Sequence, residues 1–330
     1  MKKILKIAFA AAGTIIGAGF ATGKEITVFF PVRGAAGITL LIISVVLMFT
    51  VSMLFCFKRE KDGVVDKVFG TIFTLFIASC ACVMMSGGGA ALNETFGIPT
   101  VLGTVLTYII CILITFFGID GIYLFNSFAT PVMIFLICLV SFKGLTKEVF
   151  LSSSPAFLCV SYCGYNLLSF LPFIKSVREN EENPHIFIKG TLLGFCAVLV
   201  CAVFIKLAAD KFYIMLLGSE LPLLKIANIG GRLYGIFYGI CAYLAILTTA
   251  ASSVFCLSDG KNIFAVTLPL LLLSFIGFEK LVTHVYSFFG YAGTAYVIYI
   301  ILTAFISKKE GIVQHGKRNG KIAEYYSGKS

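Results

Sequence analysis

Charged side chains are scarce in this chain of 330 residues: 13% are Asp, Glu, Lys or Arg, whereas 59% are hydrophobic. A water-soluble protein of this length could not cover so much apolar surface with so few charges, which excludes that class. Only three histidines are present, at His185, His284 and His315, and their wide separation argues against a metal centre.

Chemistry-bearing clusters are also lacking. The 11 cysteines form no CxxC pair and no Cys–His cluster, so they indicate packing rather than redox or metal chemistry. No cluster of His, Asp and Glu and no nucleophile–base spacing falls at membrane depth. We therefore expect that the protein is not an enzyme and that it carries no cofactor.

Apolar runs of membrane-spanning length recur along the whole chain instead. They predict an all-α polytopic membrane protein in which residues 1–306 form one transmembrane domain, followed by a basic, disordered cytoplasmic tail at 307–330. Ten spans are expected, at 4–31, 35–57, 67–92, 98–117, 121–142, 156–175, 186–209, 234–257, 262–278 and 280–306.

The distribution of Lys and Arg predicts the orientation. With the N-terminus placed in the cytoplasm, 17 of the 26 basic residues fall on the cytoplasmic side and 8 on the outside, while Lys24 lies within the membrane. Both termini are therefore expected to be cytoplasmic. The net charge of +10 reflects this bias and an attraction to membrane lipids with anionic headgroups, so no nucleic-acid partner is expected.

The first span is interrupted where a helix should be most regular. Residues 12–25 contain Gly13, Gly17, Gly19 and Gly23, each of which weakens a helix by about 1 kcal/mol relative to Ala. Lys24 and Glu25 follow at a depth where charges are costly and usually functional. This pattern predicts a broken helix at a substrate site, although the spacing of the glycines also fits close helix packing.

The ten spans divide into two halves of five, with repeat one at about 4–142 and repeat two at about 156–306. Because five is odd, the second half enters the membrane from the opposite side, which predicts an inverted repeat. Span six carries Gly164 and Asn166 within the run Ser161–Asn166, so we expect helices one and six both to be discontinuous.

The run Gly13-Thr-Ile-Ile-Gly-Ala-Gly-Phe-Ala-Thr-Gly-Lys-Glu-Ile resembles the first span of the YkvI-like bacterial membrane proteins of the amino acid–polyamine–organocation (APC) superfamily. The resemblance covers residues 4–306 and implies a LeuT-type 5+5 inverted repeat in the bacterial cytoplasmic (inner) membrane. One departure is Lys24, because such relatives more often carry a neutral polar residue there.

The resemblance also implies a substrate site between spans one and six. A substrate carboxylate would rest on the amides near Ala18 and Gly19, and an amine would lie near the carbonyls of Ser161–Gly164. The alternative is that the two tyrosines of span six are core aromatics. The substrate-binding residues expected on this basis are Gly17, Ala18, Gly19, Tyr162, Gly164, Tyr165 and Asn166.

Span eight presents Thr249, Ser252 and Ser253 on one helical face. In LeuT-type carriers a coupling Na⁺ lies between such a face and the carbonyls of the broken helix, here Gly13 and Ile16. The alternative is that these hydroxyls bond back to their own helix. Lys24 and Glu25 are candidates for a gate or for proton coupling, unless both lie in a water-filled vestibule.

The expected function is a secondary active transporter of a small amino acid or related amine that works by alternating access. Na⁺ is the first candidate for the coupling ion and H⁺ the second. The alternative is an amino-acid-sensing receptor subunit of the germinant-receptor kind, which binds its ligand without transporting it and signals through a protein partner that the sequence does not identify. The outer segment 210–233 is expected to form a lid over the entrance.

Overall fold

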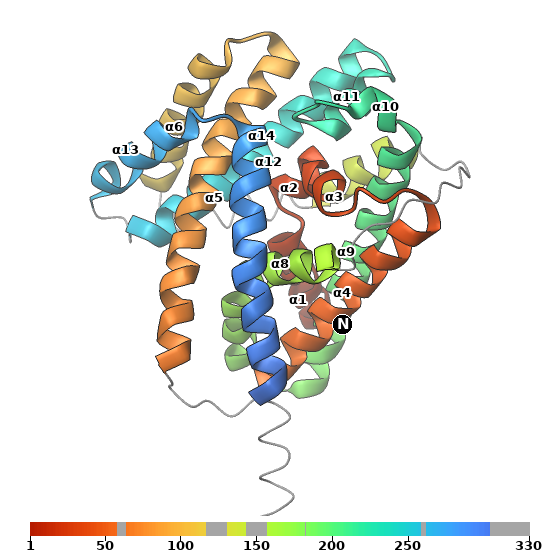
Figure 1. Cartoon of the computed structure of the whole chain (residues 1–330), viewed down its shortest axis with the longest axis vertical. Coiled ribbons are helices and arrows are strands. Elements are labelled where there is room, and N and C mark those ends of the chain that lie inside the picture. The colour runs from red at the N-terminus through yellow and green to blue at the C-terminus, as the bar shows by residue number, and fades with distance from the viewer. Residues whose placement is uncertain (58–63, 117–130, 143–156, 182, 259–261, 304–330) are drawn as a thin grey trace, which may run out of the picture.

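The computed structural model describes residues 1–57, 64–116, 131–142, 157–181, 183–258 and 262–303, and all regular elements within these ranges are helical (Figure 1). Predictions that concern the tail 307–330 and the first half of the expected fifth span lie outside the described residues.

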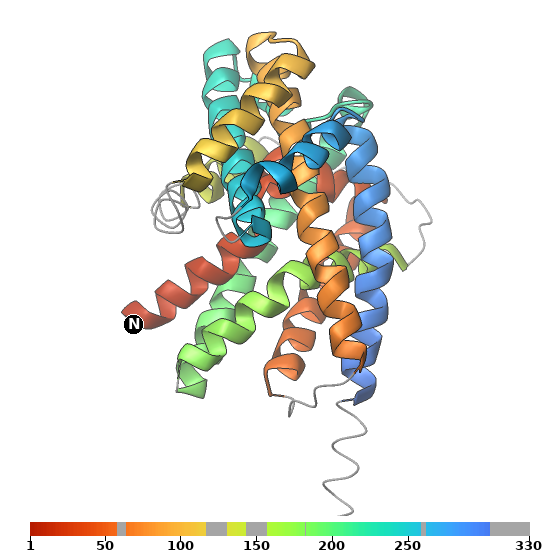
Figure 2. The ribbon, with the colours of Figure 1, turned by 90° about the vertical axis from the view of Figure 1, so that its left-hand side faces the viewer.

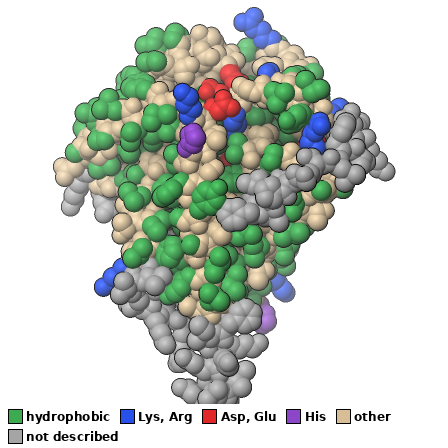
Figure 3. Space-filling view, viewed as in Figure 1, with side chains coloured by type: hydrophobic (Ala, Val, Ile, Leu, Met, Phe, Trp, Pro, Cys, Tyr) green, Lys and Arg blue, Asp and Glu red, His purple; other side chains and the backbone are tan. Residues whose placement is uncertain are grey.

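Five helices are long and apolar enough to cross a membrane. They are α4 (Gly34–Phe57), α5 (Val64–Phe96), α9 (Pro184–Lys211), α12 (Arg232–Ser258) and the helix Phe278–Thr303. The last begins as α14 (Phe278–Leu281) and passes through a π-helical turn, η2 (Val282–Tyr286), before it continues. On the face drawn in Figure 3, charged side chains gather toward the two ends and leave a largely uncharged band between them.

Other predicted spans coincide with helices that are shorter or less apolar. These are α6 (Thr100–Phe116), the helix Pro131–Ser141, α8 (Phe157–Asn180) and α13 (Ile263–Ser274). The positions expected from hydropathy therefore recur as helices within the described ranges.

The break in the first span is confirmed. α1 (Lys2–Ile15) ends before Ile16 and Gly17, and the chain resumes as α2 (Ala18–Thr22) and α3 (Lys24–Phe29). At the break, the Gly17 amide donates to the Ile15 carbonyl at 2.9 Å instead of continuing the helical ladder to Gly13. Gly23 then separates α2 from α3 with a φ of 75°, a left-handed conformation that glycine adopts without a steric cost.

The predicted interruption of span six is wrong, because α8 runs unbroken from Phe157 to Asn180 (Figure 2). Gly164 serves close packing instead: a Cβ added there would lie 2.3 Å from the Thr294 nitrogen and 2.6 Å from the Gly293 carbonyl carbon. The side-chain amide of Asn166 donates a hydrogen bond to the Tyr162 carbonyl one turn earlier, at 3.1 Å, so its polar group is satisfied by the helix itself. Both residues that suggested a break are thus accommodated by a continuous helix.

The segment 210–233, expected on the outer side, folds back over the broken helix. It contains α10 (Tyr213–Leu216) and α11 (Pro222–Asn228), and α11 packs against α2, α9 and α12 (Figure 1). Leu223 of α11 lies directly on Gly23, where an added Cβ would come within 2.8 Å of its Cγ. We call residues 212–231 the lid.

Candidate substrate site at the broken first helix

The start of α2 presents backbone amides at the centre of the molecule. The first helical bond runs from the Ala21 amide to the Gly17 carbonyl at 3.1 Å, so the amides of Ala18, Gly19 and Phe20 precede the regular ladder. Ala18 and Phe20 are buried, at 1% and 0% exposure. Three residues of the predicted substrate site, Gly17, Ala18 and Gly19, therefore lie together at the break.

Glu25 folds back onto this break. Its carboxylate lies against Gly19, where an added Cβ would come within 1.6 Å of Oε1, and only glycine leaves room for it. The same oxygen accepts a hydrogen bond from the Tyr165 hydroxyl at 2.8 Å. Glu25 is only 4% exposed. The structure thus joins a predicted coupling residue to two predicted substrate-site residues, and it buries Glu25 in protein rather than in an open vestibule.

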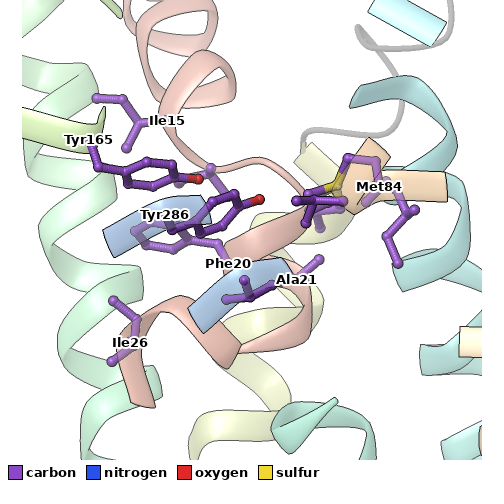
Figure 4. Packing of buried hydrophobic residues seen from close by; sticks show 14 of the residues in the cluster. Ile15, Phe20, Ala21, Ile26, Met84, Tyr165 and Tyr286 are labelled. Atoms are coloured by element: carbon purple, nitrogen blue, oxygen red, sulfur yellow. The ribbon is translucent and has the colours of Figure 1, made fainter. Parts of the chain in front are cut away.

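Aromatic rings surround the Tyr165 side chain. Tyr286 stacks on it with ring centroids 4.4 Å apart, Phe29 stacks at 5.8 Å, and Phe76 approaches edge-on at 5.6 Å. Figure 4 shows the rings of Tyr165 and Tyr286 side by side near the linker from α1 to α2. We call these four residues the ring cluster.

Only Tyr165 of the ring cluster was singled out by the sequence. Phe29 lies in α3, Phe76 in α5 and Tyr286 in the π-helical turn. Phe29 and Phe76 are two among 33 phenylalanines, so the sequence carries no signal that separates them from lipid-facing ones. The π-helical turn that positions Tyr286 has no sequence signature either, although such turns are frequent at functional sites.

Tyr162 occupies a neighbouring position on α8. Its ring packs edge-on against Phe29 at 5.4 Å and Phe30 at 5.0 Å. Its hydroxyl is fully buried and forms no hydrogen bond with any residue that the structure describes. A buried hydroxyl without a hydrogen bond is costly and often has a functional role, so Tyr162 stays a candidate wall of the site.

One of the three predicted hydroxyls of α12, that of Thr249, lies beside the break. A Cβ added at Gly17 would lie 3.7 Å from Thr249 Oγ1. Thr249 donates to the Ala245 carbonyl at 3.0 Å, and Ser253 donates to the Thr249 carbonyl at 2.8 Å. These hydrogen bonds are the ones expected if the hydroxyls bond only to their own helix, but each hydroxyl oxygen keeps lone pairs that can bind a cation. Ser252 is half-buried and lies on the same helix.

The predicted ion ligands from the first helix are its last carbonyls. Gly13 lies in the last turn of α1, and Ile16 is its C-terminal cap. The Ile16 amide still donates to the Ala12 carbonyl at 2.7 Å, whereas the following amide does not continue to Gly13. The Gly13 carbonyl thus lacks the hydrogen bond that the Gly17 amide would supply in a continued helix.

Lys24 points away from Glu25 and ties the lid to two other elements. Its Nζ donates to the Ser219 carbonyl at 2.8 Å and to Glu279 Oε1 of α14 at 2.9 Å. Lys24 is 7% exposed, whereas the Glu279 side chain is 50% exposed. The predicted gate residue therefore bridges α3, the lid and α14, and its partners Ser219 and Glu279 could not be found from sequence spacing.

Two further acidic residues hold the same loop. Glu94, near the end of α5, accepts a hydrogen bond from the Leu221 amide at 3.3 Å. The Glu220 carboxylate accepts a hydrogen bond from the backbone amide of Glu279. Burial raises the pKa of the Glu220 carboxyl above its ordinary value. Within the described ranges, no three His, Cys, Asp or Glu side chains lie close enough together to hold a metal ion.

Comparison with known proteins finds no matching family model. Two curated proteins of Bacillus subtilis (strain 168) are similar to this chain. The uncharacterized membrane protein YkvI is 24% identical over 333 residues, which cover 88% of this chain and 93% of YkvI. The uncharacterized protein YyaD is 25% identical over 332 residues, which cover 90% and 95%.

One similar solved structure is that of a manganese transporter from Eremococcus coleocola in complex with an aromatic bis-isothiourea substituted compound. The TM-score is 0.43 and the sequence identity 12%, and the match covers 94% of this chain and 72% of the transporter chain. A likeness at this level carries no argument. The apolar helices and the likeness to YkvI together decide the broader class. The chain is a multi-pass membrane protein.

Proposed function

We propose that the protein is a secondary active transporter of a small amino acid or related amine, which works by alternating access in the bacterial cytoplasmic membrane with both termini in the cytoplasm. The ten-span, five-plus-five LeuT-type arrangement belongs to this proposal, with helix one as its discontinuous member. The break at Ile16–Gly17 carries the proposal, because it lies at the centre of the molecule and faces the buried Glu25.

Helix breaks at membrane depth have a limited set of explanations. Unwound backbone there is tolerated only where protein or a water-filled cavity satisfies it, and transporters use such breaks to bind substrates and ions. A packing role for the glycines of the first span does not account for the end of α1 at Ile15. Substrate binding at Gly17, Ala18 and Gly19 would account for it.

The lid supports alternating access. Leu223 closes on Gly23, and Lys24 holds the lid through Ser219 and Glu279. Opening of the outer side would break these hydrogen bonds and expose buried side chains of α11, among them Leu224 and Ile226. We therefore propose Lys24 as the gate residue.

Counterflow in proteoliposomes tests this function. Vesicles that contain the purified protein are loaded with unlabelled amino acids or amines, and the entry of each radiolabelled compound is measured with imposed Na⁺ or pH gradients. Saturable exchange is expected for at least one compound, and a gradient of the coupling ion should concentrate it. Saturable binding without exchange would instead favour a receptor that senses the compound.

Matched variants at Gly17 test the site. Ala at this position makes only ordinary contact with Thr249, so Gly17→Ala should retain exchange, whereas Gly17→Leu should fill the break and abolish it. Both proteins should remain inserted. Equal exchange by the two variants would place the substrate elsewhere.

The coupling ion has its own test. If Na⁺ binds between α1 and α12, the double change Ser252→Ala and Ser253→Ala should remove the Na⁺ dependence of exchange while the pH dependence persists. An undiminished Na⁺ effect in that variant would exclude these hydroxyls as ligands and leave H⁺ as the coupling ion.

A further inference from the structure

We propose that Glu25 holds the ammonium group of the bound compound, so that the site takes organic ammonium compounds and an ammonium group is the obligatory feature of its ligand. This inference rests on the proposed function and names the substrate class of the same site.

The first support is the missing counter-charge of Glu25. Among the described residues, the Glu25 carboxylate accepts one hydrogen bond, from Tyr165, and no Lys, Arg or His lies within ion-pair distance of it. Its neighbour in sequence, Lys24, bonds to Ser219 and Glu279 instead. A buried carboxylate without a positively charged partner is costly, and a cationic ligand would supply the absent charge.

The second support is the ring cluster. Phe29, Phe76 and Tyr286 contact the ring of Tyr165, whose hydroxyl donates to Glu25. The faces of aromatic rings attract cations, and aromatic rings next to a carboxylate form a site suited to an ammonium group. Tyr162, three residues before Tyr165 on α8, adds a buried hydroxyl that forms no hydrogen bond within the described residues.

The third support is the continuity of α8. An amine was expected at open carbonyls of Ser161–Gly164, but these residues lie inside an unbroken helix whose carbonyls accept helical hydrogen bonds. Glu25 is therefore the strong acceptor that remains beside the break. α2 has only five residues, so its amide end alone does not make a site for a carboxylate.

The position of Glu25 also sets the selectivity expected between related compounds. The carboxylate lies on Gly19, which was expected to receive a substrate carboxylate. A second carboxylate there would meet like charge, whereas an ammonium group would be attracted. We expect an amine to bind at least as tightly as the amino acid that carries the same side chain.

Equilibrium binding to the purified full-length protein tests this. The probes are three matched pairs: isoamylamine and leucine, phenethylamine and phenylalanine, and putrescine and ornithine. Isoamyl alcohol and N-acetylated isoamylamine serve as uncharged counterparts. At least one amine should raise the melting temperature saturably, and the uncharged counterparts should not, because a ligand that binds only the folded state stabilises it.

Glu25→Gln should weaken amine binding about a hundredfold or more, because it removes one partner of a buried charge pair. Glu181→Gln, the same change at a residue that pairs with Lys3, is the matched control and should bind like the wild type. Glu25→Asp keeps the charge and should retain weakened binding. The wild-type comparison of charged and uncharged probes stays decisive even if Glu25→Gln fails to fold.

Three results would overturn the inference: no amine probe binds the wild-type protein, an uncharged counterpart binds as tightly as its amine, or Glu25→Gln binds amines as the wild type does. Failure of the transport function looks different. Amines that bind through Glu25 without counterflow would refute transport and leave the ammonium site intact, whereas counterflow of 4-methylvalerate, which lacks nitrogen, would refute the ammonium site and leave transport intact.

Discussion

A single methyl group at Gly164 should reveal how closely α8 packs against residues 290–294. An added Cβ would meet three backbone atoms, the Thr294 nitrogen at 2.3 Å, the Gly293 carbonyl carbon at 2.6 Å and the Gly290 oxygen at 2.8 Å. Backbone atoms cannot rotate away as a side chain can, so the two helices must separate. Overpacking of this kind costs about 1–3 kcal/mol.

Gly70→Ala in α5 is the matched control, because a Cβ added at Gly70 has no neighbour within 4 Å. Both variants gain about 1 kcal/mol of helix propensity, so Gly70→Ala should be stabilised by that amount. Gly164→Ala should be destabilised by up to about 2 kcal/mol, after that gain is subtracted from the cost of overpacking.

Circular dichroism during chemical unfolding in one detergent can measure this difference, since the chain has no tryptophan to report by fluorescence. The two variants should shift in opposite directions from the wild type. A Gly164→Ala protein as stable as Gly70→Ala would refute the close packing of α8 against residues 290–294. A break in this helix, as the sequence predicts, would then be the better description.

Three further predictions concern the lid, residues 212–231, and are measured by hydrogen exchange or thermal unfolding. Lys24→Ala removes the hydrogen bond to Ser219 of the lid and the ion pair with Glu279 of α14, so exchange at 217–228 should rise about tenfold, the effect of about 1.4 kcal/mol. Gly23→Ala should destabilise the protein more than Gly97→Ala, because the φ angles are 75° and 74° but only Gly23 also contacts a lid side chain. Burial raises the pKa of Glu220, so the docked lid favours the protonated carboxyl. The protection of amides 217–228, after correction for the intrinsic pH dependence of exchange, should therefore fall as the pH rises from 4.5 toward neutrality, and Glu220→Gln should flatten that fall.

Each of these predictions has a control or a contrary outcome. Lys280→Ala removes a neighbouring charge and should leave exchange in the lid unchanged. Equal losses of stability at Gly23 and Gly97 would mean that α11 does not rest on the broken helix. A pH profile of the Glu220→Gln protein that follows the wild type would assign the titration to another group.

The sequence predicts the break in helix one well, because its signal is local. Four glycines and two charges within 14 residues are costly for a membrane helix wherever the rest of the chain lies. Hydropathy likewise places the helices, because burial in lipid depends on the composition of each segment. Neither prediction needs knowledge of a distant contact.

Helix eight shows where local signals fail. Gly164 reads as a helix breaker by itself, yet it meets Gly290 and Gly293, which lie more than 120 residues away in the sequence. The roles of Tyr286 and Glu279 depend in the same way on which helices become neighbours. Tertiary packing overrides intrinsic propensity at these positions, and a single sequence does not record it.

The π-helical turn Val282–Tyr286 has a mechanical consequence for the helix that contains it. Glu279, which binds Lys24, precedes the turn, whereas Gly290 and Gly293, which pack tightly against α8, follow it. A π turn uses i→i+5 bonds, and its conversion to regular helix rotates one side relative to the other by about 100° per residue of register. The N-terminal end of this helix can therefore rotate while the C-terminal part stays packed against α8.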